Sequence, residues 1–216
     1  MRVLLAGGTG LVGNAVIDAS TQTGVALVGV GRRATGKLKQ EIVTSLGQLP
    51  TLPAADAAIC TLGTTIRTAG SREAFRAVDY GAVMAFAAAA LEAGTEHFIV
   101  VTAVGAAARS SVFYSRVKGE VERDLSALGF TRLDIIRPGL LLGDRSDNRP
   151  VESFLQTIAP LTDRLMRGSW RKYRSVRAES LAQYLLALTA LSAPGIFIHH
   201  HGEITAGLAG SGANVT

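Results

Sequence analysis

The sequence of 216 residues is poor in cysteine and in charge. It contains one Cys, which excludes an intrachain disulfide framework and a zinc or iron–sulfur site built from several cysteines. Charged residues make up 18%, and the mean hydropathy is +0.28. A disordered chain is excluded, because enough apolar surface is present to offset the conformational entropy lost on folding. We expect one compact cytoplasmic domain over residues 1–206, followed by a flexible tail at 207–216.

A long hydrophobic run is also lacking. The longest uncharged apolar stretch, at residues 82–91, is about half of the roughly 20 residues that a membrane helix needs. Residues 1–17 are apolar, but they contain glycines and no recognisable cleavage site, so we interpret them as a strand, a turn and a helix. We therefore expect neither export nor a membrane partner.

The formal net charge is +5 and the calculated pI is about 9.8. Basic residues are scattered among acidic ones and are dense only at 164–177, where aromatic residues lie among them. Single-stranded nucleic acids bind such mixtures, but normally in a groove or on a sheet. We interpret the segment as exposed surface or an interface, then as a contact for an anionic substrate, and predict no nucleic-acid partner. Its members are Arg164, Arg167, Trp170, Arg171, Lys172, Tyr173, Arg174 and Arg177.

Short aliphatic segments alternate along the chain with longer segments of helical periodicity. Continuous apolar strands are typical of a parallel sheet that helices cover on both faces. The predicted fold class is therefore α/β, with a doubly wound parallel sheet. The predicted strands are 3–6, 25–30, 57–62, 98–104, 133–137 and 196–199, with a further short strand at 41–44, and the predicted helices are 11–22, 71–93, 114–128, 151–166 and 178–191.

A glycine-rich loop follows the first predicted strand and leads directly into a helix. A pyrophosphate group needs close approach to the backbone and free N–H groups at a helix N-terminus, and glycine allows both. We predict a dinucleotide site here; the alternative is a tight turn whose small residues pack against the helix. The loop residues are Gly7, Gly8, Thr9, Gly10, Leu11, Val12 and Gly13.

The end of the second predicted strand bears on the choice of cofactor. An acidic residue at this place normally accepts from the ribose 2′-hydroxyl of NAD, whereas an arginine suits the 2′-phosphate of NADP. The sequence has Arg32 and Arg33 there and no acid. We therefore predict NADP(H) in preference to NAD(H); the alternative is a pair of solvated loop arginines.

Tyr114 and Lys118 lie four residues apart and so share one face of a predicted helix. A phenol is a poor acid or base at neutral pH, but a nearby cation lowers its pKa. We predict that the pair is catalytic; the alternative is an ordinary amphipathic helix with a half-buried tyrosine. Farther along, Glu120, Glu122 and Arg123 are interpreted as a solvent-exposed face.

Together these motifs resemble the short-chain dehydrogenase/reductases, in particular the atypical branch related to the human Tat-interacting protein and to bacterial sugar-epimerase-like proteins. The resemblance covers about residues 1–200 and rests on the segments 7–13, 31–33, 60–65, 114–122 and 136–139. It implies a Rossmann-type NAD(P)-binding fold with a small C-terminal extension on the substrate side. It also implies an NADPH-dependent oxidoreductase that acts on a small carbonyl or alcohol.

The resemblance assigns roles to individual positions. Tyr114 would be the general acid or base, and Lys118 would hold the nicotinamide ribose and lower the tyrosine pKa. The turn containing Pro138 would border the nicotinamide. The segment that passes the adenine side of the cofactor contains Leu62, Gly63, Thr64 and Thr65.

Two positions depart from the family pattern. Relatives often have two serines where this chain has Thr102 and Ala103, and an Asn where it has Asp79. If the Thr102 side chain faces the cofactor, it completes a catalytic triad with Tyr114 and Lys118. If it does not, Ser110 or Ser111 replaces it, or the protein binds NADP(H) as a sensor or regulator with little turnover.

Two further expectations concern metals and assembly. The run His199, His200 and His201 has no acid or cysteine at ligand spacing, so we predict no metal site. The alanine-rich helix at 82–93 either packs on its own sheet or pairs two copies into a homodimer.

Overall fold

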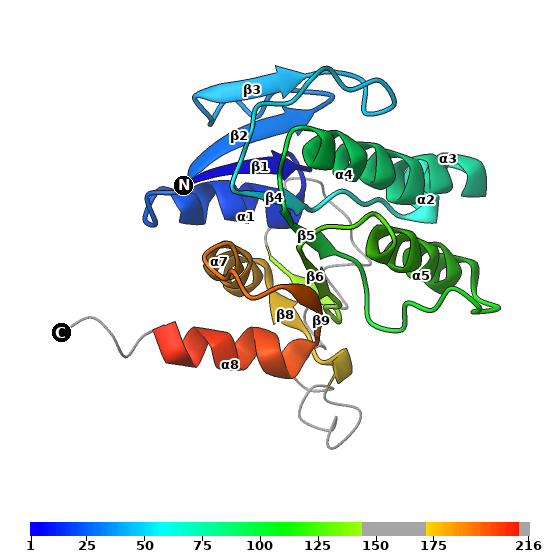
Figure 1. Ribbon diagram of the computed structural model, residues 1–216. Coiled ribbons are helices and arrows are strands. Elements are labelled where there is room, and N and C mark those ends of the chain that lie inside the picture. The colour runs from blue at the N-terminus through cyan, green and yellow to red at the C-terminus, as the bar shows by residue number, and fades with distance from the viewer. Residues whose placement is uncertain (144–171, 212–216) are drawn as a thin grey trace.

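Seven parallel strands form one sheet in the computed structural model of the chain, in the order β3-β2-β1-β4-β5-β6-β9 (Figure 1). The structure describes residues 1–143 and 172–211. All six pairings within the sheet are parallel, so the predicted doubly wound fold is confirmed. The strands are β1 (Arg2–Ala6), β2 (Ala26–Gly31), β3 (Gln40–Val43), β4 (Ala57–Cys60), β5 (His97–Val101), β6 (Arg132–Ile136) and β9 (Gly195–His199).

Helices cover both faces of the sheet (Figure 1). One face carries α1 (Leu11–Ser20) and α7 (Ala178–Leu188), and the other carries α4 (Val83–Glu92) and α5 (Phe113–Ser126). The short helices α2 (Ile66–Ala69) and α3 (Arg72–Arg76) precede α4, and α8 (His201–Ser211) follows β9. A separate parallel pair joins β7 (Leu141–Leu142) to β8 (Val176–Arg177).

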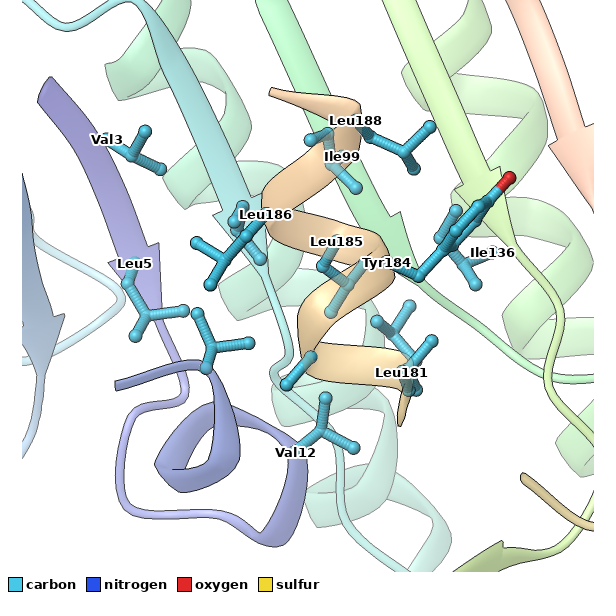
Figure 2. Packing of buried hydrophobic residues seen from close by; sticks show 14 of the residues in the cluster. Val3, Leu5, Val12, Ile99, Ile136, Leu181, Tyr184, Leu185, Leu186 and Leu188 are labelled. Carbon is cyan, nitrogen blue, oxygen red and sulfur yellow. The ribbon is translucent and has the colours of Figure 1, made fainter. Parts of the chain in front are cut away.

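The core consists of two apolar layers, one on each face of the sheet. In Figure 2, Leu186 of α7 points toward β1, where Val3 and Leu5 lie, and Tyr184 points toward Ile136 of β6. Each fully buried aliphatic side chain contributes about 1.5–3 kcal/mol to stability. These layers hold the strands in register, so the carboxyl ends of neighbouring strands meet at one edge, where ligands of such sheets bind.

The helix predicted at 71–93 is a composite of α3, the π-helix η1 (Ala77–Ala82) and α4. By length and composition alone, residues 72–92 could cross a membrane, a property that core helices of soluble proteins share. Here Phe75 and Phe86 are buried in the protein. A π-turn inserts an extra residue and rotates the side chains that follow, and such turns are frequent at functional sites.

Other segments differ from the predicted elements or fall outside the description. The helix α2 was not predicted, and α8 occupies residues 207–211 of the segment expected to be a flexible tail. The predicted helix at 151–166 lies outside the described residues.

Candidate functional site

A cleft of about 850 Å³ opens at the carboxyl ends of β1, β2 and β4. It lies at the edge of the sheet where the sequence predicts the dinucleotide site. Most of the residues predicted to bind the cofactor's phosphates and adenine side line it. These are Gly7, Gly8, Thr9, Gly10, Arg32, Arg33, Leu62, Gly63 and Thr64.

The glycine loop has a shape that side chains would prevent. Gly7 adopts a φ of +92°, in the left-handed region, and its carbonyl accepts a hydrogen bond of 2.9 Å from the Gly10 N–H. A Cβ on Gly13 would lie 2.1 Å from the Gly7 carbonyl oxygen, so this glycine allows α1 to pack against the loop. Gly10 caps α1 without a side-chain hydrogen bond, which leaves N–H groups of the first turn for a ligand. Val12 is buried in the core, whereas Leu11 is half-buried.

Arg32 and Arg33 lie in the cleft wall with exposed side chains. Within the described part of the chain, neither guanidinium makes an ion pair or a side-chain hydrogen bond. Glu41 of β3, which was not predicted from the sequence, lines the same cleft. Its carboxylate accepts hydrogen bonds from the Thr35 N–H (2.7 Å), the Thr35 hydroxyl (2.5 Å) and the Gly36 N–H (3.1 Å). Glu41 therefore fixes the loop that carries the two arginines.

Hydrogen bonding also sets the ionisation of Glu41. Burial opposes its charged form, but the hydrogen bonds from Thr35 and Gly36 outweigh burial, so the Glu41 pKa lies below its ordinary value. The partners lie only five and six residues before Glu41, but no sequence motif marks the contact.

The segment after β4 closes the inner side of the cleft. The Thr61 hydroxyl donates to the Ala6 carbonyl (3.0 Å), and the Thr64 N–H donates to Asp79 Oδ2 (2.8 Å). Thr65 caps α2 by accepting from the Thr68 N–H. A Cβ on Gly63 would lie 3.5 Å from Asp79 Oδ1 and 3.6 Å from Lys118 Nζ, so the cleft adjoins these two groups.

Asp79 and Lys118 form an ion pair beside the cleft. Their atoms Oδ1 and Nζ are 2.7 Å apart, and the side chains are 0% and 5% exposed. η1 carries Asp79 and α5 carries Lys118, so the two elements are joined through a buried charge pair. Burial raises the pKa of Asp79, an effect that Lys118 and the Thr64 N–H partly offset.

Tyr114 lies one turn before Lys118 on α5, with its ring 5.6 Å from that of Phe75 between centroids. Lys118 lowers the Tyr114 pKa, as the sequence predicts, but its contribution does not decide the net shift. Burial raises the pKa of Tyr114, Lys118 opposes the rise, and Asp79 adds to it, so the net shift is upward. The cation is evident in the sequence, whereas the burial of Tyr114 and the approach of Asp79 depend on the tertiary fold.

The Thr102 hydroxyl is held in a different network. It lies 2.6 Å from Glu122 Oε1 and 3.2 Å from the Ile136 carbonyl oxygen, and can give its one hydrogen only to these acceptors. Glu122 lies two turns along α5 from Tyr114, about 12 Å at 1.5 Å per residue. Of the two arrangements that the sequence left open, the structure thus has Thr102 turned toward the protein.

Glu122 corrects a further interpretation. It is 5% exposed and accepts two hydrogen bonds from Arg137, at 3.0 and 2.5 Å, so it is not part of a solvent-exposed face. The buried Pro138 follows, and its carbonyl accepts from the Val104 N–H (3.0 Å). As for the substitutes for Thr102, the Ser110 hydroxyl accepts from the Val112 N–H (3.1 Å), and Ser111 is exposed.

The remaining candidates are a metal site, the single cysteine and the basic segment. Among residues 1–143 and 172–211, no group of three or more His, Cys, Asp or Glu side chains is arranged to hold a metal ion. Burial raises the pKa of the Cys60 thiol to about 12, so it is unreactive. Of the basic segment, Arg164, Arg167, Trp170 and Arg171 lie outside the described residues.

Solved structures share the fold at low sequence identity. MoeE5 in complex with UDP-glucose and NAD superimposes with a TM-score of 0.70 at 16% identity, over 97% of this chain and 82% of that one. The human epimerase family protein SDR39U1 (isoform 2) with NADPH superimposes with a TM-score of 0.64 at 22% identity, over 93% and 74% of the two chains. At this identity the likeness establishes the Rossmann-type fold.

Curated relatives are closer in sequence. The mitochondrial protein fmp52 of Aspergillus niger is 33% identical over 77% of this chain and 78% of its own length. The protein of the same name from Aspergillus fumigatus is 35% identical over the same shares. Both names specify mitochondria, which contradicts the expectation of a cytoplasmic protein. That expectation rested on composition, which reflects the folded core and not the compartment.

A family model provides the assignment of the chain. The model described as HIM1 matches residues 29–167, which include the arginine pair, the π-helix and the tyrosine and lysine of α5. The resemblance to short-chain dehydrogenase/reductases is thus correct for the fold, but neither the family model nor the curated names specify the Tat-interacting branch. By this match and by its identity to the fungal proteins, the chain belongs to the HIM1 family.

Proposed function

We propose that this protein is an NADPH-dependent oxidoreductase of the short-chain dehydrogenase/reductase type that acts on a small carbonyl or alcohol. The observation that carries the proposal is the position of Tyr114, one helical turn from the buried Lys118–Asp79 pair that adjoins the glycine-loop cleft. A proton donor beside a dinucleotide cleft is what hydride transfer to a carbonyl requires.

The residues of the cleft fit a nicotinamide dinucleotide. The left-handed Gly7 and the uncapped start of α1 offer backbone N–H groups to a pyrophosphate. Arg32 and Arg33 suit the 2′-phosphate of NADP, and Glu41 holds the loop on which they lie. When bound, the dinucleotide supplies the hydride. Among the neighbours of the same fold, MoeE5 was solved with NAD and SDR39U1 with NADPH, which supports a nicotinamide cofactor.

In this proposal Lys118 binds and orients the ribose of the cofactor. An ammonium has three N–H donors, and the ion pair with Asp79 accounts for one of them. Among residues 1–143 and 172–211 no further partner takes the other two, so they can hold ribose hydroxyls at the edge of the cleft next to Gly63. Tyr114 then donates its proton to the substrate oxygen, or accepts one from it, as general acid or base.

A binding titration tests the cofactor. NADPH and NADH are titrated into the protein while nicotinamide fluorescence is followed, and we expect NADPH to bind more tightly. Tighter binding of NADH would overturn the role assigned to Arg32 and Arg33.

A screen of small carbonyl compounds for NADPH oxidation tests the chemistry. Loss of a general acid typically lowers the rate about 10²- to 10⁴-fold, which we expect for Tyr114→Phe. Tyr80→Phe is the matched control, because the Tyr80 hydroxyl is bonded to Asp124 (2.9 Å) within the protein. A rate that Tyr114→Phe leaves unchanged would exclude Tyr114 as the acid.

One observation favours a second candidate, an NADP(H)-binding sensor or regulator with little turnover. Thr102, the one hydroxyl residue at the carboxyl end of β5, gives its hydrogen to the protein and not to a substrate. Tight NADPH binding without oxidation by any carbonyl in the screen would support the sensor; turnover that depends on Tyr114 would exclude it.

A further inference from the structure

The charge pair beside Tyr114 consists of one ammonium and one carboxylate, so its two charges are balanced. Asp79 Oδ1 lies 2.7 Å from Lys118 Nζ, and both side chains are buried. Asp79 Oδ2 accepts the Thr64 N–H at 2.8 Å, so the carboxylate is held from two sides. The π-turn η1 places Asp79 in this position, opposite α5.

Few ionisable groups face this pair. α5 contributes Tyr114 and Lys118, η1 contributes Asp79, and β4 contributes Cys60, whose thiol stays protonated because burial raises its pKa to about 12. Within the described residues, the charges that act on Tyr114 are therefore those of Lys118 and Asp79, and they have opposite sign. Their effects on the phenol oppose each other, and burial favours its neutral form.

We propose that Asp79 keeps the Tyr114 hydroxyl protonated by neutralising Lys118, and so adapts the site to donate a proton to a carbonyl oxygen rather than to remove one from an alcohol. The proposal rests on the oxidoreductase function and adds the direction for which the site is suited. An uncharged residue at position 79 would leave the ammonium of Lys118 uncompensated, and that ammonium would stabilise the phenolate.

The proton inventory follows from this arrangement. In the reductive direction Tyr114 gives its proton to the carbonyl oxygen, and a bound reduced nicotinamide would supply the hydride that the carbonyl carbon takes up. One hydride and one proton convert the carbonyl into an alcohol, with the dinucleotide as the reductant that would be oxidised, and the Tyr114 phenolate regains its proton from solvent. The reverse reaction needs the phenolate at the start, and the neutral pair makes that form scarce at neutral pH.

The first experiment requires no substrate. Tyrosinate absorbance is followed against pH in the full-length protein, and the curve of Tyr114→Phe is subtracted to isolate Tyr114. Asp79→Asn keeps the shape of the side chain and removes the charge, so we expect Tyr114 to titrate about one to three pH units lower. An unchanged or higher titration in Asp79→Asn would overturn the proposal.

A double substitution provides the matched control. Asp79→Asn with Lys118→Met removes both charges together, so Tyr114 should titrate within about half a pH unit of the native protein if the two charges cancel. If Tyr114 titrates as low in the double variant as in Asp79→Asn alone, the two charges do not cancel. If Asp79→Asn does not fold, Lys118→Met alone leaves the carboxylate facing Tyr114 and should raise its titration; no rise would contradict the proposal.

The second experiment measures rates against pH in both directions, with a carbonyl and its alcohol from the screen. In Asp79→Asn the decline of reduction at high pH should move to lower pH. Oxidation at neutral pH should rise about tenfold for each unit by which the tyrosine pKa falls. If the pH profiles of reduction and oxidation do not move with the Tyr114 titration measured by absorbance, the claim that the site is suited to reduction is overturned. A different outcome is also possible: the native protein shows no turnover, yet Tyr114 titrates lower in Asp79→Asn. That outcome would contradict the oxidoreductase function but would support the charge balance between Asp79 and Lys118.

Discussion

Asp134 Oδ1 and His199 Nε2 lie 2.7 Å apart between β6 and β9, with the carboxylate fully buried. The other oxygen of Asp134 lies 2.7 Å from His97 Nε2, and Arg132 donates two hydrogen bonds to the carboxylate, of 2.7 and 2.9 Å. The Tyr184 hydroxyl reaches His199 Nδ1 at 2.8 Å. This network links β5, β6, β9 and α7 within the apolar layer on one face of the sheet.

We expect Asp134→Asn to lower the free energy of unfolding by about 3–5 kcal/mol, because Arg132 would be left buried without its anion. Urea denaturation measures the change. Asp18→Asn is the control: its partner is Lys37, both side chains are well exposed, and such pairs contribute little. Equal effects of the two substitutions would contradict the structural importance of Asp134.

The contacts of Asp134 also predict that the free energy of unfolding depends on pH. Burial opposes its ionisation, but hydrogen bonds from His199, His97 and Arg132 outweigh burial and hold the Asp134 pKa well below its usual range. Since an unfolded Asp titrates near pH 3.9, the stabilisation is fully present above about pH 5 and declines as the pH falls further. The difference in unfolding free energy between the native protein and Asp134→Asn should therefore narrow in acid. A difference that widens below pH 5 would be inconsistent with a lowered pKa.

A second prediction concerns the glycine loop. Gly13→Ala places a Cβ 2.1 Å from the Gly7 carbonyl oxygen, so α1 or the loop must move. We expect a loss of about 1–3 kcal/mol in stability and weaker NADPH binding, although alanine is the better helix former. Thermal unfolding and fluorescence titration measure the two effects.

The control for that variant is Gly202→Ala. Gly202 lies in the first turn of α8 with open space around its Cα, so alanine should be neutral or slightly stabilising. Normal NADPH binding by Gly13→Ala would show that the close approach is not needed.

A third prediction concerns cofactor choice. Replacement of both Arg32 and Arg33 by Gln should weaken NADPH binding about 10- to 100-fold, since a hydrogen bond to a charged group contributes about 1.5–3 kcal/mol. NADH affinity should change much less, because NADH lacks the 2′-phosphate. Arg109→Gln removes one positive charge from an exposed position away from the cleft and serves as control. Parallel losses for NADPH and NADH would indicate a nonspecific electrostatic effect.

A fourth prediction separates stability from catalysis at Thr102. Thr102→Val removes the hydroxyl that donates to Glu122, although Arg137 still donates to this carboxylate and the Thr102 N–H still donates to the Ile136 carbonyl. Since a hydrogen bond to a charged group contributes about 1.5–3 kcal/mol, we expect a loss of about 1–3 kcal/mol in stability. Thr102→Ser retains the hydroxyl and should retain most of the stability. At a temperature where each variant is folded, NADPH oxidation by Thr102→Val should fall far less than in Tyr114→Phe. A loss as large as that of Tyr114→Phe would mean that the Thr102 hydroxyl turns toward the substrate during the reaction.

Much of the fold could be predicted because its signals are local. Strands buried on both faces appear as short aliphatic runs, and every predicted strand corresponds to one in the sheet, including the short β3. The glycine loop could also be predicted, since Gly7, Gly10 and Gly13 are neighbours in the chain and meet within one turn. The π-turn was beyond such reasoning, because the apolar pattern of residues 71–93 does not distinguish it from an α-helix.

Individual side-chain environments were less predictable than the elements that carry them. Glu122 was interpreted as exposed, yet Arg137 and Thr102 bury it. The partners of Glu122 follow β5 and β6, so this contact exists only after distant segments have packed together. Glu41 contacts Thr35 and Gly36, which are close in the chain, but no sequence motif marks that contact.

The order of the residues along the chain was enough to predict a parallel α/β sheet with a glycine-rich loop after its first strand and a tyrosine and a lysine on one helix face. Each of these features depends on residues that lie only a few positions apart in the chain. Tertiary structure decided the electrostatics: it brought Asp79 to Lys118 and turned Thr102 toward Glu122. The physical reason is that charge and hydrogen bonding act through space, and the distances that govern them exist only after distant segments have packed together.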